Sequence, residues 1–176
     1  LKEIGIQVAQ NKVITGEDDS QITDKIIQET EYWSYNRESF QWEIDGVVIK
    51  LGKRFCNISL INSETIIAGS GVLDKKISKF SEDNSIGGME FLSCIPGTIG
   101  GGIKVNSGCY NREFKNIILS VQAVDTLGKV ITIPAEKIDF HYRGSSLSDE
   151  LIFLSATLKG YSKNKTLIAK EITELR

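Results

Sequence analysis

The chain has 176 residues, of which 40% are hydrophobic and 25% charged, and its formal net charge at pH 7 is -2. This composition is that of an ordinary globular protein, long enough for one well-buried core or for one domain with a small appendage. The slight negative charge offers no basic surface for nucleic acid, and no apolar run approaches the length that spans a membrane. We therefore expect neither a nucleic-acid partner nor a membrane association.

The three cysteines, Cys56, Cys94 and Cys109, are too few and too widely spaced for a metal cluster, and their odd number argues against a disulfide framework. A reducing, cytoplasmic location is the simpler reading. The single histidine, His141, lacks partner ligands in the sequence, so we expect no metal site. Residue 1 is Leu and the one methionine is Met89, so we expect a piece of a longer protein.

The first 45 residues differ in character from the rest. Ser20 or Thr23 can cap a helix that runs to about Arg37, and residues 47–51 form a β-branched apolar run typical of a buried strand. This helix followed by EIDGVVIK resembles the adenylation domain of NAD-dependent DNA ligases, which implies that Lys50 faces an adenylate phosphate. A strand-end lysine in water is the alternative. The Lys-x-Asp-Gly motif of that family does not occur, which excludes a complete ligase.

Residues 56–72 predict two strands around a polar turn at Asn62–Glu64. Asp74 can then begin a helix that ends at Asn84. Its expected apolar face consists of Leu73, Ile77 and Phe80.

The stretch from Gly87 to Gly108 holds seven of the sixteen glycines. Glycine is costly to order, so such a cluster needs a local reason. One reason is a backbone that approaches a ligand closely and turns consecutive N–H groups toward an anion such as a diphosphate. Thr98 and Asn106 would add hydrogen-bonding groups. A tight turn or bulge between strands is the alternative.

Within that stretch, EFLSCIPGTIGGGIKVNSG resembles the central flavin-binding segment of UDP-N-acetylenolpyruvoylglucosamine reductase, the MurB family. The resemblance implies an α+β FAD-binding domain of the vanillyl-alcohol-oxidase type over residues 46–176, with a mixed sheet and flanking helices, after a separate segment of residues 1–45. It implies FAD and NADPH as cofactors and reduction of a UDP-sugar enolpyruvyl ether for peptidoglycan synthesis. The implied cofactor-binding residues are Gly69, Gly71, Pro96, Gly97, Thr98, Gly100, Gly101, Ile103, Asn106 and Gly108.

Further along, residues 118–134 predict a hairpin that turns at Leu127–Gly128. The run FHYRGSS then resembles the Tyr-Arg-x-Ser motif of the same reductases. It implies that Arg143 stabilises the enolate intermediate, Tyr142 lines the substrate or nicotinamide side, and Ser145 supplies a supporting hydroxyl. Arginine suits this role because it is always charged and presents a planar fork of donors. An Arg that covers a strand end with its aliphatic stem is the alternative.

The chain departs from the reductases at both ends. The Gly-Ser-Asn loop that cradles the flavin diphosphate has no match in residues 1–45, and the substrate domain with its proton-donating serine and late glutamate is absent. Proton transfer needs a donor within hydrogen-bonding reach. We therefore expect partial flavin affinity and no turnover by this chain alone. A fragment of a ligase adenylation domain and a folded remnant without catalysis are the alternatives.

Overall fold

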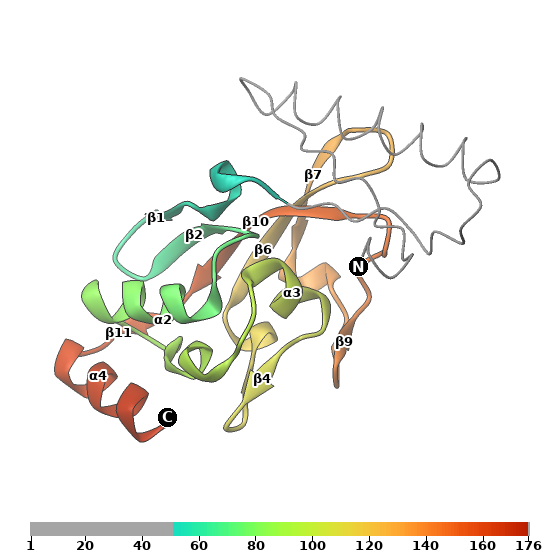
Figure 1. Cartoon of the computed structure of the whole chain (residues 1–176). Coiled ribbons are helices and arrows are strands. Elements are labelled where there is room, and N and C mark those ends of the chain that lie inside the picture. Colours follow the sequence, from blue (N-terminus) through green and yellow to red (C-terminus); the bar gives the residue numbers. More distant parts are fainter. Residues whose placement is uncertain (1–50, 176) are drawn as a thin grey trace, which may run out of the picture. The chain divides into compact units, whose positions relative to one another are not determined.

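The computed structural model describes residues 51–175 (Figure 1). The chain divides into two units, Leu1–Val48 and Ile49–Arg176, and the description concerns the second. The predicted ligase-like segment and Lys50 lie outside the described residues. Within residues 51–175, no helix has the length and apolar character needed to cross a membrane. The same residues bring together no three His, Cys, Asp or Glu side chains able to hold a metal ion.

A five-stranded sheet in the order β1-β2-β10-β6-β7 forms the centre of this unit (Figure 1). Its strands are β1 Ile58–Leu60, β2 Thr65–Gly69, β6 Ile118–Val124, β7 Val130–Pro134 and β10 Ile152–Lys159. Every neighbouring pair in it is antiparallel, so the mixed sheet that we expected is antiparallel in the described part. Both predicted hairpins are present: Asn62 Oδ1 accepts the Glu64 N–H at 3.0 Å in the first turn. In the second turn, Asp125 Oδ1 accepts the Leu127 N–H at 2.9 Å.

Within residues 51–175, three helices and several short elements accompany the sheet, which confirms the predicted α+β class. The helices are α2 Asp74–Asp83, α3 Ile99–Lys104 and α4 Lys165–Glu174, and the 3-10 turns are η3 Lys53–Cys56, η4 Glu90–Cys94, η5 Phe114–Asn116 and η6 Ala135–Lys137. The two-residue strands are β3 Ile86–Gly87 with β11 Tyr161–Ser162, β4 Gly108–Cys109 with β5 Arg112–Glu113, and β8 Phe140–His141 with β9 Gly144–Ser145. Helix α3 packs on β10 and β2, whereas α2 packs on η4 and α4.

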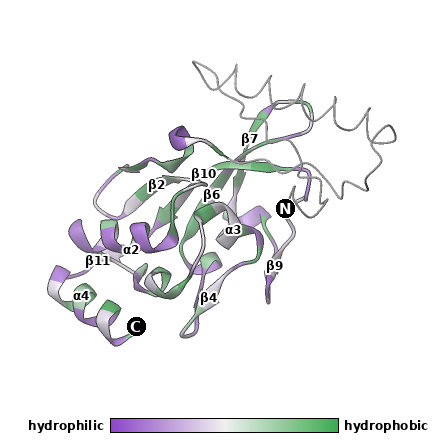
Figure 2. Cartoon of the chain, viewed as in Figure 1, coloured by the Kyte–Doolittle hydropathy of each residue, from purple (hydrophilic) through white to green (hydrophobic). Residues whose placement is uncertain are grey.

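The core lies between the sheet and these short elements. Phe91 and Phe114 are fully buried and meet edge to face with ring centroids 6.4 Å apart, a favoured aromatic geometry. Figure 2 shows hydrophobic residues along the central strands and hydrophilic ones on the outer side of α2. On α2 the predicted apolar face is right for Ile77, which is fully buried, but Leu73 is 38% exposed because it pairs with the neighbouring turn instead.

Candidate functional site

Two glycine-bearing loops lie side by side at one end of α2 and α3. We call them the paired loops: residues 69–74, from the last residue of β2 to the first of α2, and residues 95–100, from the end of η4 into the first turn of α3. The Ile99 N–H donates to the Val72 carbonyl at 2.9 Å and the Asp74 N–H donates to the Gly97 carbonyl at 3.1 Å. These two bonds flank an antiparallel bridge between Leu73 and Thr98. In this arrangement the N–H of Thr98 points away from Leu73 and out of the pair.

We predicted that consecutive glycine N–H groups would point toward a ligand. Most of these N–H groups instead donate to carbonyl groups of the protein. Residues 99–104 are helix α3 instead of an open loop. The Gly97 N–H donates to the Ile95 carbonyl, the Gly100 N–H to the Ser70 carbonyl and the Gly102 N–H to the Thr98 carbonyl, at 3.1, 2.9 and 2.8 Å. Buried backbone donors need such partners. The Gly97 bond lies within its own turn, the Gly100 bond joins the two loops, and the Gly102 bond belongs to the first turn of α3, so none of these three N–H groups is free for a ligand.

Close approach between parts of the protein explains most of the glycines that we predicted to bind the cofactor. A Cβ atom at Gly97 would lie 2.9 Å from Asp74 Oδ2, and one at Gly100 would lie 3.0 Å from the Ser70 Cβ. The nearest atom is the Phe55 carbonyl oxygen at 2.1 Å for Gly69, Cys56 Sγ at 2.9 Å for Gly71 and the Arg112 carbonyl oxygen at 2.3 Å for Gly108. Gly102, which was not among the predicted residues, is equally confined, with the Phe114 ring at 2.2 Å.

Gly101 is different. It is exposed within α3, and the one atom near a Cβ placed there would be Thr98 Oγ1, at the ordinary contact distance of 3.7 Å. No neighbouring group of the described protein therefore requires a glycine at this position. Gly101 and the neighbouring Thr98 therefore form a surface with room for a ligand at the start of α3, which we call the open strip.

Two buried polar side chains lie between the paired loops without hydrogen-bond partners among the described residues. They are the Ser70 hydroxyl and both carboxyl oxygens of Asp74, with 3% and 0% of the residues exposed. Burial raises the pKa of Asp74 from 3.8 to about 7, because the charged form loses its hydration. Buried polar groups are nearly always satisfied, so this cluster requires an explanation.

The predicted Tyr-Arg-x-Ser residues lie on the β8–β9 hairpin. Tyr142 and Arg143 form its tip, where Arg143 adopts a positive φ of 57°. The Arg143 Nε donates to the Tyr142 hydroxyl at 3.3 Å, and the guanidinium carbon lies 5.6 Å from the centre of the Tyr142 ring. Tyr142 is 85% exposed. The pair therefore presents a stacked cation and ring to solvent.

Side-chain hydrogen bonds fasten this hairpin to the glycine-rich segment. The Ser145 hydroxyl donates to the Lys104 carbonyl at 3.1 Å, at the end of α3. The Asn106 amide donates to the His141 carbonyl at 3.2 Å. The structure thus brings the predicted substrate-binding residues beside the segment predicted to bind the cofactor.

Two of the predicted cofactor-binding side chains are used within the protein. Asn106 is 4% exposed; its amide also donates to Glu113 Oε2, and its oxygen accepts the Lys115 N–H at 3.0 Å. With both donors and the oxygen engaged, Asn106 fixes local structure. Ile103 is fully buried in the core. Neither side chain is available to a ligand in this arrangement, whereas Pro96 is exposed.

A buried ion-pair cluster centred on Glu90 of η4 was not predicted. The Glu90 carboxylate, with 0% of its side chain exposed, accepts from Arg112, Lys163 and the Gly88 N–H, each at 2.8 Å. Burial alone would raise the pKa of Glu90, but the Lys163 bond and the backbone N–H groups outweigh it and lower the pKa. Glu171 completes the cluster from α4 through Arg112 and Lys163.

The neighbouring residues Arg112 and Glu113 make separate ion pairs. Arg112 pairs with Glu90 and Glu171, whereas Glu113 pairs with Lys115 and caps η5. In sequence, Glu90 stood out only as part of the Glu-Phe-Leu-Ser run, and one of its partners is 73 residues away.

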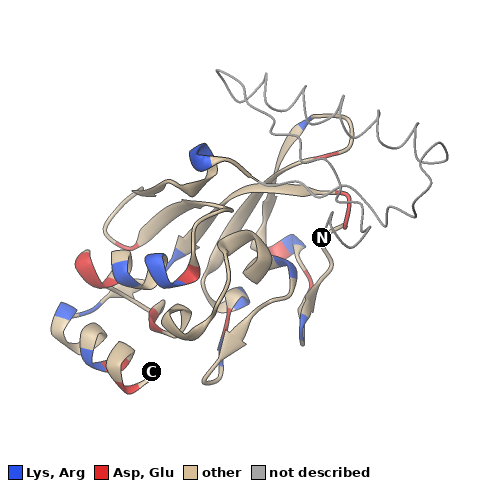
Figure 3. Ribbon diagram, in the orientation of Figure 1, with Lys and Arg blue, Asp and Glu red and all other residues tan. Residues whose placement is uncertain are grey.

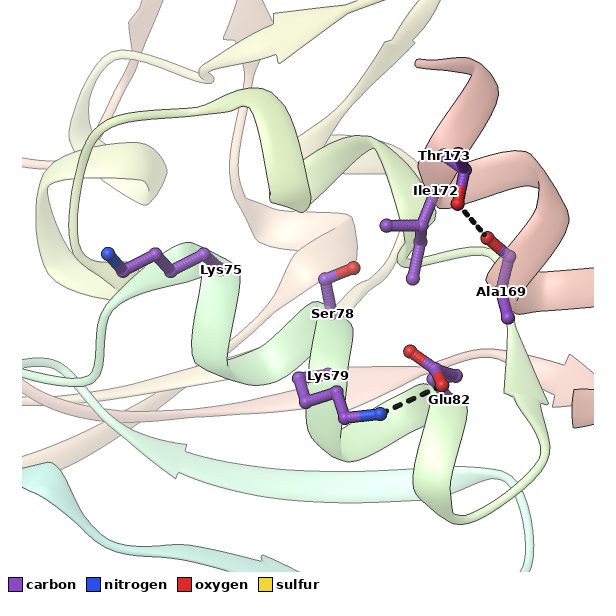
Figure 4. A pocket seen from close by; sticks show the side chains of 7 residues that line it. All are labelled: Lys75, Ser78, Lys79, Glu82, Ala169, Ile172 and Thr173. Carbon is purple, nitrogen blue, oxygen red and sulfur yellow. Dashed lines mark hydrogen bonds and ion pairs between the residues drawn. The ribbon is translucent and has the colours of Figure 1, made fainter. Parts of the chain in front are cut away.

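A cleft of about 330 Å³ lies between α2 and α4 (Figure 4). Its lining is Lys75, Ser78, Lys79, Glu82, Ala169, Ile172 and Thr173. Charged residues line both helices (Figure 3), and Lys79 is bonded to Glu82 at 2.8 Å. No predicted site residue contributes to this cleft, so it is separate from the paired loops.

Comparison with known proteins identifies the family of this chain. Residues 34–134 match the family model described as an FAD binding domain, which covers more than half of the chain. The chain belongs to the FAD binding domain family. The predicted FAD cofactor is thereby confirmed, and the open strip at Thr98 and Gly101 fits such a group.

The particular relatives are UDP-N-acetylenolpyruvoylglucosamine reductases. That of Pelagibacter ubique is 58% identical over 134 residues, which is 76% of this chain and 44% of the relative. That of Rickettsia massiliae is 46% identical over 136 residues, 76% of this chain and 46% of the relative. The crystal structure of the Thermus caldophilus reductase superposes with a TM-score of 0.66 at 26% identity, over 74% of this chain and 48% of that one.

These matches confirm the predicted resemblance to the reductases. The chain spans about half the length of the relatives it matches. The predicted resemblance of residues 1–50 to DNA ligases finds no support in them.

Proposed function

We propose that this chain binds FAD on the open strip of half-buried Thr98 and exposed Gly101. We further propose that it is the flavin-binding part of a protein that reduces UDP-N-acetylenolpyruvoylglucosamine to UDP-N-acetylmuramate with NADPH, in peptidoglycan precursor synthesis. The relatives carry the name of this reductase over 76% of the chain. When bound, FAD would supply the hydride transfer, and the protein would supply position and electrostatics.

The observation that carries the location of the site is Gly101. A glycine inside a helix costs about 1 kcal/mol relative to alanine. Every other glycine in the paired loops and α3 has a protein neighbour within 3.0 Å of its would-be Cβ, but Gly101 does not. A cofactor lying against α3 would explain the missing side chain. The outward N–H of Thr98 would offer that cofactor a donor.

The β8–β9 hairpin would serve the substrate. The Arg143 guanidinium could stabilise the enolate oxygen that forms when hydride reaches the enolpyruvyl group, because a fixed cation is most effective where charge develops. Tyr142 would hold the guanidinium through the Nε–hydroxyl bond of 3.3 Å. Ser145 would fix the hairpin against α3 through its bond to the Lys104 carbonyl.

The setting of the reaction is part of the proposal. The cysteines in the described part of the chain, Cys56, Cys94 and Cys109, are free thiols, which supports a reducing, cytoplasmic setting. Residues 46–176 would form the flavin-binding domain. Since the relatives are about twice as long, we expect NADPH-dependent turnover only when the remainder of the reductase is supplied.

The test is FAD binding by the purified chain. The protein is incubated with FAD and desalted, its absorbance spectrum is recorded, and the dissociation constant is measured by quenching of flavin fluorescence. We expect retained flavin. Gly101→Ala should weaken FAD binding about tenfold or more, whereas the matched variant Gly52→Ala should not, because no protein atom lies within 4 Å of its added methyl group. A folded chain that retains no flavin would contradict the proposal, and equal affinity of Gly101→Ala would contradict the location.

A further inference from the structure

We propose that Asp74 is a pH-sensitive positioning residue for the FAD site: its neutral carboxyl group holds the turn of residues 95–98 in the conformation that binds FAD, and its ionisation releases that turn. This inference rests on the proposed function. It concerns a residue that would act through the turn and not by touching the cofactor.

The geometry places the Asp74 carboxyl group directly beneath the turn. Its own backbone N–H donates to the Gly97 carbonyl at 3.1 Å, and a Cβ at Gly97 would lie 2.9 Å from its Oδ2. Asp74 is 0% exposed, so the Gly97 backbone helps to cover it. Neither carboxyl oxygen has a hydrogen-bond partner among the described residues, and the neighbouring Ser70 hydroxyl lacks one as well.

The charged groups on the surrounding elements do not neutralise Asp74. On its own helix, Lys75 and Lys76 are exposed. The turn of residues 95–98 carries no titratable side chain. In η4, Glu90 is bonded to Arg112 and Lys163.

The titratable groups on the other elements near the paired loops are likewise bonded to groups other than Asp74. Cys94 of η4 donates to the Leu175 carbonyl at 3.0 Å. In α3, Lys104 is bonded to the Leu147 carbonyl and to Asp149. Burial is accordingly the cause of the raised pKa of Asp74.

Ionisation at this position has a structural consequence. An unpaired carboxylate in a dry site is strongly unfavourable, so the protein gains by admitting water to it. Water can reach Asp74 only if the cover over it opens, and Gly97 is part of that cover. The closed conformation of residues 95–98 therefore favours the protonated carboxyl group of Asp74. A ligand that binds only to the closed conformation binds preferentially to the protein with Asp74 protonated. FAD affinity should fall as the pH rises above the pKa of this group.

The test compares the pH dependence of FAD affinity in three proteins: the unaltered chain, Asp74→Asn, and the control Asp83→Asn. Asp83 lies on the same helix, but its side chain is 46% exposed and paired with Lys79 and Lys165. We expect the dissociation constant of the unaltered chain and of Asp83→Asn to rise up to tenfold per pH unit above about pH 7. That of Asp74→Asn should stay constant, because its amide cannot ionise.

A second measurement does not depend on the variant. The carboxyl carbon of Asp74 and the amides of Gly97 and Thr98 are followed by NMR in the unaltered chain without FAD. The inference expects the carboxyl and both amides to titrate together. An FAD affinity independent of pH would overturn the inference and leave the proposed function standing. A pH dependence that persists in Asp74→Asn would also overturn it. A folded chain that binds no FAD at any pH would overturn the proposed function first, and this coupling with it.

Discussion

Replacing Asp74 with Asn should change the pH dependence of stability in a direction that the structure fixes. Asn keeps the shape of the side chain and removes its ionisation. In the unaltered chain, burial raises the pKa of Asp74 from 3.8 to about 7. The folded state thus binds the proton more tightly than the unfolded state. The resulting stabilisation is complete below pH 3.8 and is lost as the pH rises through about 7.

The magnitude follows from the size of the shift. Each pKa unit corresponds to 1.36 kcal/mol, so a shift of about three units amounts to about 4 kcal/mol between the two limits. With 0% of Asp74 exposed, solvent screening does not reduce this value. Roughly two of the three units fall between about pH 5 and about pH 8, where about 3 kcal/mol should be lost. This is a large part of the total stability of about 5–15 kcal/mol that proteins of this kind have.

The assay is urea unfolding followed by circular dichroism at several pH values in that range. The free energies of unfolding of Asp74→Asn and of the unaltered chain should be similar at the acid end and should diverge in favour of the variant as the pH rises. Asp83→Asn is the control: Lys165 and Lys79 lower the pKa of Asp83, so the contribution of this group is already constant over the range. A difference between Asp74→Asn and the unaltered chain that does not change with pH would refute the reasoning, because the carboxyl group would then not be a buried neutral acid.

Three further predictions concern the cofactor strip, the ion-pair cluster and the hairpin. Gly101→Ala should raise the free energy of unfolding by up to about 1 kcal/mol while it weakens FAD binding, and Gly102→Ala should destabilise the fold because its methyl group would lie 2.2 Å from the Phe114 ring. Glu90→Gln should lower the free energy of unfolding by about 1–3 kcal/mol, measured by urea denaturation, because Arg112 and Lys163 lose their buried partner and keep only Glu171; an unchanged value would mean that water solvates the cluster. Arg143→Ala should leave stability and FAD affinity unchanged and lower the turnover of the complete reductase about 10²–10³-fold in a steady-state NADPH assay; loss of FAD binding would contradict its role.

The elements that local sequence pattern determines were predictable. The first hairpin and α2 follow from apolar spacing, a polar turn and a capping position, all within a few residues. Helix α3 was not predictable, because three consecutive glycines argue against a helix. The bonds to the carbonyls of Ser70 and Val72 hold its first turn in place, and such tertiary partners override local propensity.

The family was predictable from sequence motifs, whereas the contacts of the candidate site residues were not. The order of the glycines, Asn106 and Arg143 was enough to identify the family. The reasons for individual residues depend on contacts between distant segments. Gly69, for example, is required by the Phe55 carbonyl oxygen. Asp74 was expected to begin α2 and is its first residue, but its side chain bonds to no backbone N–H and instead underlies Gly97.

The buried carboxyl groups of Asp74, which underlies the turn of residues 95–98, and of Glu90, in η4 just before that turn, differ in a way that separates their effects. Burial alone would raise the pKa of Glu90, but the Lys163 bond and backbone N–H groups lower it, so Glu90 is ionised and its effect through η4 should not vary over the neutral range. Asp74 has no such partners and a pKa of about 7. Changes of pH near neutrality should therefore act on the side of the turn that faces α2. It follows that Glu90→Gln should weaken FAD binding by a similar factor at every pH, with the slope against pH retained, whereas Asp74→Asn should remove the slope.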